Sequence, residues 1–528
     1  MIMKKLYMAA MALAVSSLAA AQDTYESGRL LGSDLNGTAR YVGMGGAMDA
    51  LGADLSTISS NPAGIGLFRH STASVSVGLV SMQDVQKFDG LSKTKLSFDQ
   101  IGFVYSARVS RKSFVNFAFN YHKSRNFNQI LSAAAGLSQS SSNDLSYHKA
   151  ERQSENNGGW YWDNTLAEPT IGYVDQKSDL RALTYSQADW LNANVLMKEQ
   201  RGEKDWPLYS NYADAYAFDR AHRGWINDFD FNISGNSNDR FYWGVTIGIH
   251  DVNYRGNSTY AESLIDSQGD AGTVTYNDER KITGTGFDIK AGVIIRPVEA
   301  SPFRFGLTIA TPTWYNLKSQ NNTTMYNDSY YGAYNDGNVH ETYDFKYYTP
   351  WKFGVSLGHT VGRMVALGLG YEYSDYGAAQ NRVNNGTDYY GNTASTTDQP
   401  MKRNTENALK GVHTVKAGVE LKPDPALAVR FGYNFVSAAY DKNGIRDMTI
   451  PSYGVMYAST NDYTNWKATH RLTCGIGYKF SNISLDAAYQ YSATKGDFHP
   501  FQPYANDMGA VEVANKRHQV LLTLGYTF

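Results

Sequence analysis

The 528-residue chain contains a single cysteine, Cys474, and only 13 prolines. One cysteine excludes an intramolecular disulfide framework, and its position deep in the chain excludes a lipid-anchoring cysteine at a signal cleavage site. Nowhere after residue 21 does the sequence contain an apolar run of the roughly 18 residues that a membrane-spanning helix needs. If the chain lies in a membrane, we therefore expect it to cross as a β-barrel.

The sequence also lacks an excess of charge of either sign, and it lacks catalytic motifs. The formal net charge is −2, and no basic run indicates a nucleic-acid partner. The 11 histidines are scattered, with neither the partner set of a nucleophile nor the paired spacing of metal ligands, and no G-x-S-x-G motif occurs. These absences argue against an enzyme and predict neither a cofactor nor a metal ion.

What the sequence has in abundance is aromatic and small residues. It contains 39 tyrosines and 48 glycines, and its mean hydropathy is −0.44. This is too polar for a helical membrane protein and rich in residues that favour strands. At the start of the chain, Lys4 and Lys5 precede an apolar run from Leu6 to Leu18, and Ala19-Ala20-Ala21 follow. We interpret residues 1–21 as a secretory signal peptide, with Gln22 as the first mature residue.

From Ser71 onward, apolar residues alternate with polar ones in segments typical of half-buried strands. The last ten residues show the pattern, because Val520, Leu522, Leu524 and Tyr526 share one face and Phe528 ends the chain. On the opposite, mainly polar face, Leu521 is an exception. We count fourteen such strands, around residues 75–79, 101–109, 115–121, 229–233, 241–249, 287–295, 303–309, 351–357, 365–373, 415–421, 427–435, 472–480, 483–491 and 520–528.

The connections between these strands alternate strictly between short and long. Every second connection is short, for example 110–112 and 480–482, whereas the intervening ones run from about a dozen to about a hundred residues. Short periplasmic turns and long extracellular loops are typical of outer-membrane barrels. The fold class that we predict is all-β: a fourteen-stranded antiparallel transmembrane barrel at residues 71–528, located in the outer membrane of a Gram-negative bacterium.

About fifty mature residues, 22–70, precede the first strand and show little alternation. We expect them to fill the lumen as a plug, or hatch, because an empty barrel of this size would leak. The plug is predicted to contain a short helix around Ala39 to Leu51. Its Gly43-Met44-Gly45-Gly46 cluster is not a dinucleotide-binding fingerprint, since Met48 stands where a third glycine is needed, and tight backbone packing explains it.

The stretch Gly37 to Gly64, GTARYVGMGGAMDALGADLSTISSNPAG, resembles the N-terminal hatch of the FadL/TodX family of outer-membrane hydrophobic-compound transporters. Members of that family have a fourteen-stranded barrel and a hatch that carries an Asn-Pro-Ala motif, which is matched here by Asn61-Pro62-Ala63. The resemblance implies that these three residues form the gating part of the hatch.

The resemblance also implies a mechanism. Hydrophobic compounds such as long-chain fatty acids or aromatic hydrocarbons would be captured by extracellular loops, pass to a lumen pocket, shift the hatch and diffuse passively, leaving through a kink in the third strand in the best-understood relatives. The third strand of this chain, Ser113 to Phe127, contains no glycine or proline to mark such a kink.

The longest connection, 128–224, is the predicted capture region. Its aromatic side chains, which combine an apolar body with a polar end, suit a water-facing groove for an apolar ligand, and Ser186 with Asp189 forms a capping-box pattern before a helix that runs to about Met197. The alternative is that the aromatics pack the loop into a small core of its own. The candidate capture residues are Trp160, Trp162, Trp190, Leu191 and Trp206.

Two other function classes stay open from the sequence. A general diffusion porin or an adhesive or structural barrel would explain the strands and the long Tyr- and Asn-rich loops, but a porin does not need a plug of fifty residues. The partners that we expect are hydrophobic small molecules and the surrounding outer-membrane lipid and lipopolysaccharide, with no nucleic acid, and we expect a monomer. The sequence does not choose the cargo; relatives are sometimes labelled haemin receptors, yet no His or Tyr here has the spacing of an axial haem ligand.

Overall fold

The computed structural model describes residues 21–154, 160–163, 170–173, 185–199, 208–332, 335–387, 393–502 and 509–528. The expected signal peptide therefore lies outside the described residues, apart from Ala21. No helix in the described part of the chain is both long and apolar enough to cross a membrane.

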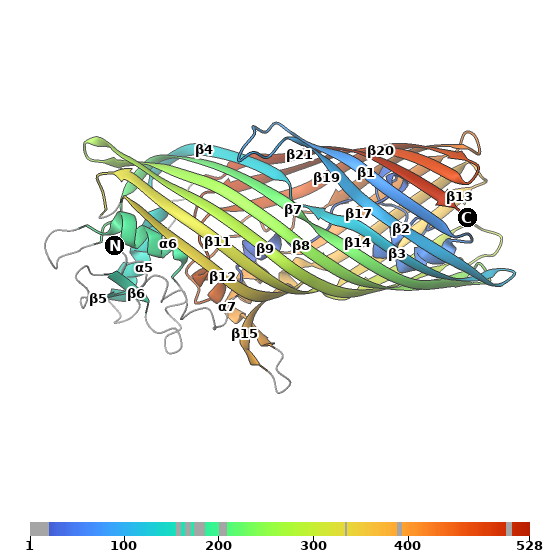
Figure 1. Ribbon diagram of the computed structural model, residues 1–528, viewed down its shortest axis with the longest axis horizontal. Helices are drawn as coiled ribbons and strands as arrows, with labels where there is room; N and C mark the ends of the chain where they lie inside the picture. Colours follow the sequence, from blue (N-terminus) through green and yellow to red (C-terminus); the bar gives the residue numbers. More distant parts are fainter. Residues whose placement is uncertain are drawn as a thin grey trace.

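Fourteen antiparallel strands close into a barrel (Figure 1), which confirms the predicted fold class. Closure is made by the last strand, whose Leu524 pairs with Val75 and whose Thr527 pairs with Thr72 of the first. The strands in order around the barrel are β1 (Thr72–Gln83), β2 (Thr94–Ser110), β3 (Ser113–Asn126), β7 (Tyr212–Ser237), β8 (Phe241–Asp266), β9 (Gly269–Ile295), β10 (Arg304–Ala310), β13 (Lys352–Val361), β14 (Val365–Asp375), β17 (Gly411–Leu421), β18 (Leu427–Val436), β19 (Tyr463–Phe480), β20 (Ile483–His499) and β21 (Val511–Thr527).

Three of these strands are prolonged, after a break, at the end of the barrel that carries the long connections. β3 is followed by β4 (Gln129–Ser140), β10 by β11 (Trp314–Ser329), and β13 is preceded by β12 (Asp336–Tyr348). Pro312 and Pro350 lie in the last two breaks, where a residue without an N–H cannot continue the ladder. Strands thus continue into the segment 128–224 that was expected to be a loop, because β4 and the first half of β7 pair there.

The two faces of each strand follow the predicted alternation. On β21, Val520, Leu522 and Tyr526 are exposed on the outside, whereas Thr523 is buried inside. Cys474 is exposed on the same outer face as Leu472 and Ile476, as its parity predicts. Leu521, the apolar exception, is buried in a cluster with Leu35, Tyr41 and Met48 of the plug, so its place in the sequence pattern is explained by what fills the lumen.

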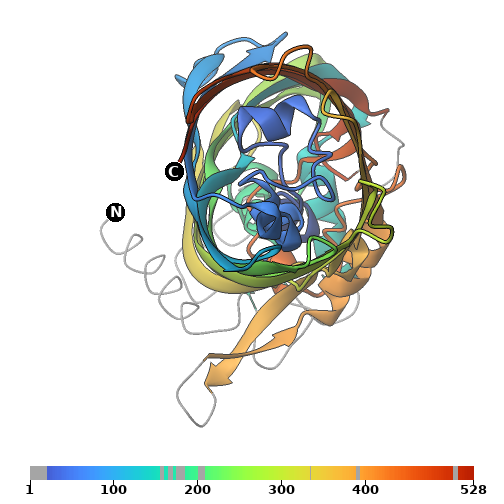
Figure 2. The same ribbon diagram turned by 90° about the vertical axis from the view of Figure 1, so that its right-hand side faces the viewer.

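The plug lies within the ring of strands, as Figure 2 shows in blue. Its helices are α2 (Thr24–Gly28), α3 (Ala39–Gly43), α4 (Thr57–Ser60) and the 3₁₀ helix η1 (Pro62–Leu67). The helix predicted at 39–51 is shorter than expected, because Gly45 and Gly46 have φ angles of +64° and +78° and end it in turns. A Cβ atom at Gly45 would lie 2.7 Å from the backbone N of Tyr433 in β18, so the glycine cluster packs directly against the wall.

The remaining elements belong to the long connections. They are α5 (Ser142–Ser154), β5 (Trp160–Asp163), β6 (Thr170–Tyr173), α6 (Gln187–Leu191), the π-helix η3 (Asn192–Met197), η4 (Tyr376–Ala378), the hairpin β15 (Gln380–Thr387) and β16 (Thr393–Thr397), α7 (Gln399–Ala408) and α8 (Tyr453–Met456). The predicted capping box of α6 is present, since Ser186 Oγ accepts from Asp189 N and the Asp189 carboxylate accepts from Ser186 N.

Candidate functional site

The candidate site is the lumen, where the plug meets the wall through ion pairs that cross from one to the other. Arg40 of α3 lies 3.0 Å from Glu420, which in turn lies 2.7 Å from Arg430. Asp49 lies 3.1 Å from Lys416 Nζ, and both of these side chains are buried. Inward-facing charges on alternating strand positions are thus matched by charges on the plug, because buried ions need partners.

The predicted gating motif lies at the start of η1, next to the barrel wall. Asn61 Oδ1 accepts a hydrogen bond from Ala63 N at 3.1 Å, so Asn61 caps the 3₁₀ helix and Pro62 occupies its first position. Asn61 and Ala63 are fully buried, and a Cβ atom at Gly306 of β10 would lie 3.0 Å from Asn61 Nδ2. The structure brings the three residues together against β8, β9 and β10; their role in gating stays a prediction.

The wall itself is incomplete between β2 and β3. In the described chain, β2 pairs with β3 only from Gln100, opposite His122, to Ser110, whereas β2 residues 94–98 pair with β1 alone. Beyond His122, the third strand bends away and breaks between Asn126 and Gln129. Strand–strand hydrogen bonds are therefore missing along one stretch of the barrel wall.

This break exists although the third strand has no glycine or proline. The glycine lies on the neighbouring strand instead: Gly224 of β7 has a φ angle of +109°, and its carbonyl accepts from Phe127 N at the break. A Cβ atom at Gly224 would overlap the carbonyl oxygen of Asn253. The signal for the bend was in the sequence, but only strand pairing shows that residue 224 lies beside residue 127.

Plug residues occupy the edges of the break. Asp34 N donates to Ser124 O at 2.8 Å, and the Asp34 carboxylate accepts from Asn126 N at 2.8 Å. Asn36 bridges the gap, since its Nδ2 donates both to Lys123 O and to Asp99 Oδ1 of β2, each at 3.0 Å. The plug thus satisfies backbone groups that a neighbouring strand would otherwise satisfy.

Basic side chains surround Asp34. Arg471 and Arg517 lie 3.8 and 3.9 Å from its carboxylate. Burial alone would raise the pKa of Asp34, but the guanidinium groups of Arg125, Arg517 and Arg471 hold this pKa below its usual value. Asp34 is therefore an ionised anchor between the plug and the wall.

A cavity of about 390 Å³ lies between the plug and the wall at this level. Its lining combines tyrosines of the plug and the strands with ionic groups, among them Arg220, Asp228, Glu372 and Arg471. Several of these ionic groups come from inward-facing strand positions. The cavity is consequently more polar than a pocket built only for hydrocarbon would be.

The predicted capture residues are only partly described. Trp160 and Trp162 lie in β5, but their side chains lie outside the described residues, as does Trp206 altogether. Leu191 is fully buried, and half-buried Trp190 packs against the same cluster, which also contains Tyr216, Phe218 and Phe498. These two residues thus pack into an apolar cluster that the segment 128–224 shares with neighbouring strands, and their role in capture stays a prediction.

No family model matches the sequence, and none of the curated proteins matches it. Among solved structures, the chain is similar to a FadL homologue from Pseudomonas aeruginosa and to the toluene transporter TbuX from Ralstonia pickettii, each at 12% identity and a TM-score of 0.48, with 94% of this chain and 99% of the other covered. The P. putida toluene transporter TodX follows at 10% identity and a TM-score of 0.47, with the same coverage. The fold assignment rests on this chain's own strand pairing, and the three solved structures named above are of the FadL and TodX type, the family that its N-terminal segment resembles.

Proposed function

We propose that this protein is an outer-membrane channel for hydrophobic compounds, in which the plug gates passive diffusion. The apolar outer face of the closed barrel, flanked by short turns at one end and long connections at the other, supports a location in the outer membrane of a Gram-negative bacterium. The expected secretory signal at residues 1–21 is consistent with that location.

One observation carries the proposal: Asp34 and Asn36 of the plug hold the edges of the break between β2 and β3. Displacement of this segment would remove the partners of Ser124, Asn126 and Asp99 and open the lumen toward the side of the barrel. A side exit lets an apolar cargo reach the lipid without crossing water. The Asn61-Pro62-Ala63 segment would then transmit or limit the plug movement as part of the gate.

The lining of the cavity supports a cargo with one polar end. Ionic groups that lose water without a partner are destabilised, so an unsubstituted hydrocarbon would leave them unmatched. A long-chain fatty acid offers an apolar tail and a carboxylate. We therefore favour amphipathic cargo. The residues of the segment 128–224 that would first contact this cargo are Trp160, Trp162, Trp190, Leu191 and Trp206.

A general porin is the second candidate, because the ionic lining would also suit small polar solutes. The plug argues against it, since ion pairs and hydrogen bonds tie the plug to the wall on several sides.

The test is to lock the plug to the wall. In a Cys474→Ser background, Asn36→Cys and Asp99→Cys place two thiols where the side chains now form a 3.0 Å hydrogen bond. A short, reducible thiol cross-linker should lower fatty-acid uptake by at least about tenfold in cells that lack their own channel, and a reductant should restore it. Each single-cysteine variant is the control. Full uptake by the cross-linked protein would contradict plug gating.

A further inference from the structure

Six ionisable side chains form a closed ring on the lumen wall, in which acidic and basic groups alternate. They come from four adjacent strands, β3, β7, β8 and β9, and all are buried. Gly248 makes the room, because a Cβ atom there would collide with the Asp288 carboxylate and lie 2.9 Å from Lys290 Nζ. In order around the ring they are Asp230, His122, Asp228, His250, Asp288 and Lys290.

In both Asp228 and Asp230, one carboxylate oxygen already has partners other than His122. Asp228 Oδ1 lies 2.7 Å from His250 Nδ1 and accepts from Ser124 Oγ at 2.7 Å. Asp230 Oδ1 accepts from Lys290 Nζ at 3.1 Å. These contacts fix the orientation of both carboxylates, as the outer contacts of metal-binding carboxylates do.

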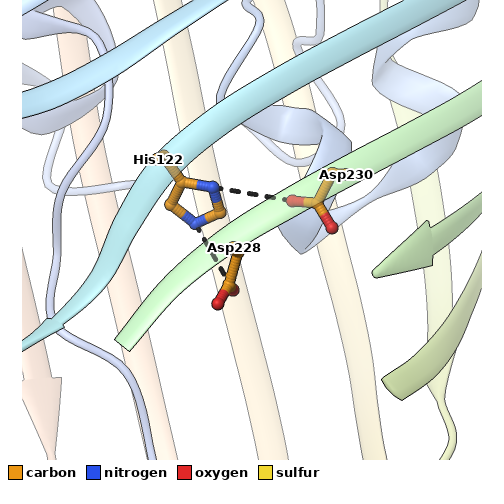
Figure 3. Close-up of side chains that lie close together, drawn as sticks. All are labelled: His122, Asp228 and Asp230. Atoms are coloured by element: carbon orange, nitrogen blue, oxygen red, sulfur yellow. Dashed lines mark ion pairs between the residues drawn. The ribbon is translucent and has the colours of Figure 1, made fainter. Parts of the chain in front are cut away.

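The other two oxygens face His122 (Figure 3). Asp230 Oδ2 lies 3.5 Å from His122 Nδ1, and Asp228 Oδ2 lies 3.8 Å from His122 Nε2. Asp230 Oδ2 has no hydrogen-bond partner although Asp230 is fully buried. One ligand atom from each of the three residues lies within 4.8 Å of the others. A buried, unpartnered carboxylate oxygen aimed at such a set is a position that a cation would satisfy.

The residue types of the set indicate which kind of cation it would hold. An imidazole nitrogen combined with carboxylate oxygens suits transition-metal ions such as Zn²⁺, whereas Mg²⁺ and Ca²⁺ prefer oxygen ligands alone.

We propose that His122, Asp228 and Asp230 bind one divalent transition-metal ion. Three protein ligands leave further coordination positions, and His122 and Asp228 also line the lumen cavity, from which water can complete the coordination. The expectation from the sequence that no metal ion is bound would then be wrong, because spacing along the chain cannot show ligands that come from two paired strands.

The place of this site gives it a structural role. His122 is the last residue of β3 that pairs with β2, and it lies opposite Asp228 of β7. A metal ion there would join β3 to β7 where the wall begins to open. This inference does not depend on the transported compound.

The test uses the full chain without a histidine tag, in detergent, after treatment with a chelator. Titration with ZnCl₂ at neutral pH should show one saturable site per chain, and metal analysis after gel filtration should find about one zinc ion. His122→Ala and Asp230→Asn should each weaken binding by at least about tenfold. The matched control replaces the three outer-face histidines, His413, His470 and His518, by Gln, and should bind zinc like the unaltered chain.

Heat-modifiable migration on gels reports whether each variant assembles a barrel. If a variant fails to assemble, the test uses the thermal unfolding midpoint of the unaltered protein. Zinc should raise this midpoint, and a chelator should reverse the rise. Absence of a saturable site, absence of that rise, or equal binding by assembled His122→Ala and Asp230→Asn variants would each overturn the proposal and leave the ring as an ion-pair network of protonated histidines.

Discussion

At the scale of single residues, Asp34 carries the contact between the plug and the break in the wall. Its carboxylate accepts from Asn126 N and faces Arg471 and Arg517, and its backbone N–H is bonded to Ser124 O. Hydrogen bonds to charged groups contribute about 1.5–3 kcal/mol each. A single change at this position should therefore loosen the plug without altering the strands.

We predict that Asp34→Asn raises the open probability of the channel in planar bilayers by about tenfold or more, the equivalent of about 1.4 kcal/mol. Because the pKa of Asp34 in the folded protein lies below its ordinary value of 3.8, the contact is fully present above that pH and is lost as pH falls further below it. The unaltered channel should thus approach the variant only under such acidic conditions. Asp84→Asn, which removes an exposed pair with Lys516, is the control and should change nothing.

A second prediction at the scale of single residues concerns replacement of Asn61 and Pro62. Replacing both by Ala removes the cap on Ala63 N and the fixed φ of the first 3₁₀ position, which should cost about 1–2 kcal/mol locally. We expect fatty-acid uptake to fall several-fold while the barrel still migrates as a heat-modifiable band. Pro302→Ala, in a short turn outside the plug, serves as the control. Normal uptake by the double variant would remove the motif from the gating account.

At the scale of elements, strand positions could be predicted because the period of two is read directly from adjacent residues. All fourteen expected strands have counterparts in the barrel. The pattern could not show which strands pair. The break after Asn126 lies beside Gly224, about a hundred residues away in the chain, and the helix at 39–51 was cut short by the left-handed Gly45 and Gly46. The prolongations β4, β11 and β12 were missed for the same reason, since their register with the neighbouring strands decides their length.

The role of Gly224 can be tested at this scale. Gly224→Ala should strain the backbone, because φ is +109° and the added Cβ atom would overlap the carbonyl of Asn253. We predict a loss of about 1–3 kcal/mol and a lower thermal unfolding midpoint. Gly136→Ala in β4, where the nearest atom to the added Cβ lies 3.5 Å away, should be close to neutral. Equal midpoints for the two variants would show that position 224 does not require glycine.

At the scale of the whole molecule, the plug and the barrel form one ionic and apolar unit. The plug was predictable as a segment without alternation in a chain whose barrel needed filling. Its partners were not, because Arg40–Glu420, Asp49–Lys416 and Asn36–Asp99 join residues that lie tens to hundreds of positions apart. The same limit applies to the ring around His122, whose members are brought together only by strand register.

Deletion of residues 22–69 shows whether the plug closes the barrel and controls a pathway for hydrophobic cargo. If it does, the assembled deletion variant should conduct ions steadily in planar bilayers, where the unaltered protein is closed for most of the time, and cells that carry the variant should lose selective fatty-acid uptake. An assembled variant that stays closed and still takes up fatty acid at the original rate would rule out gating by the plug.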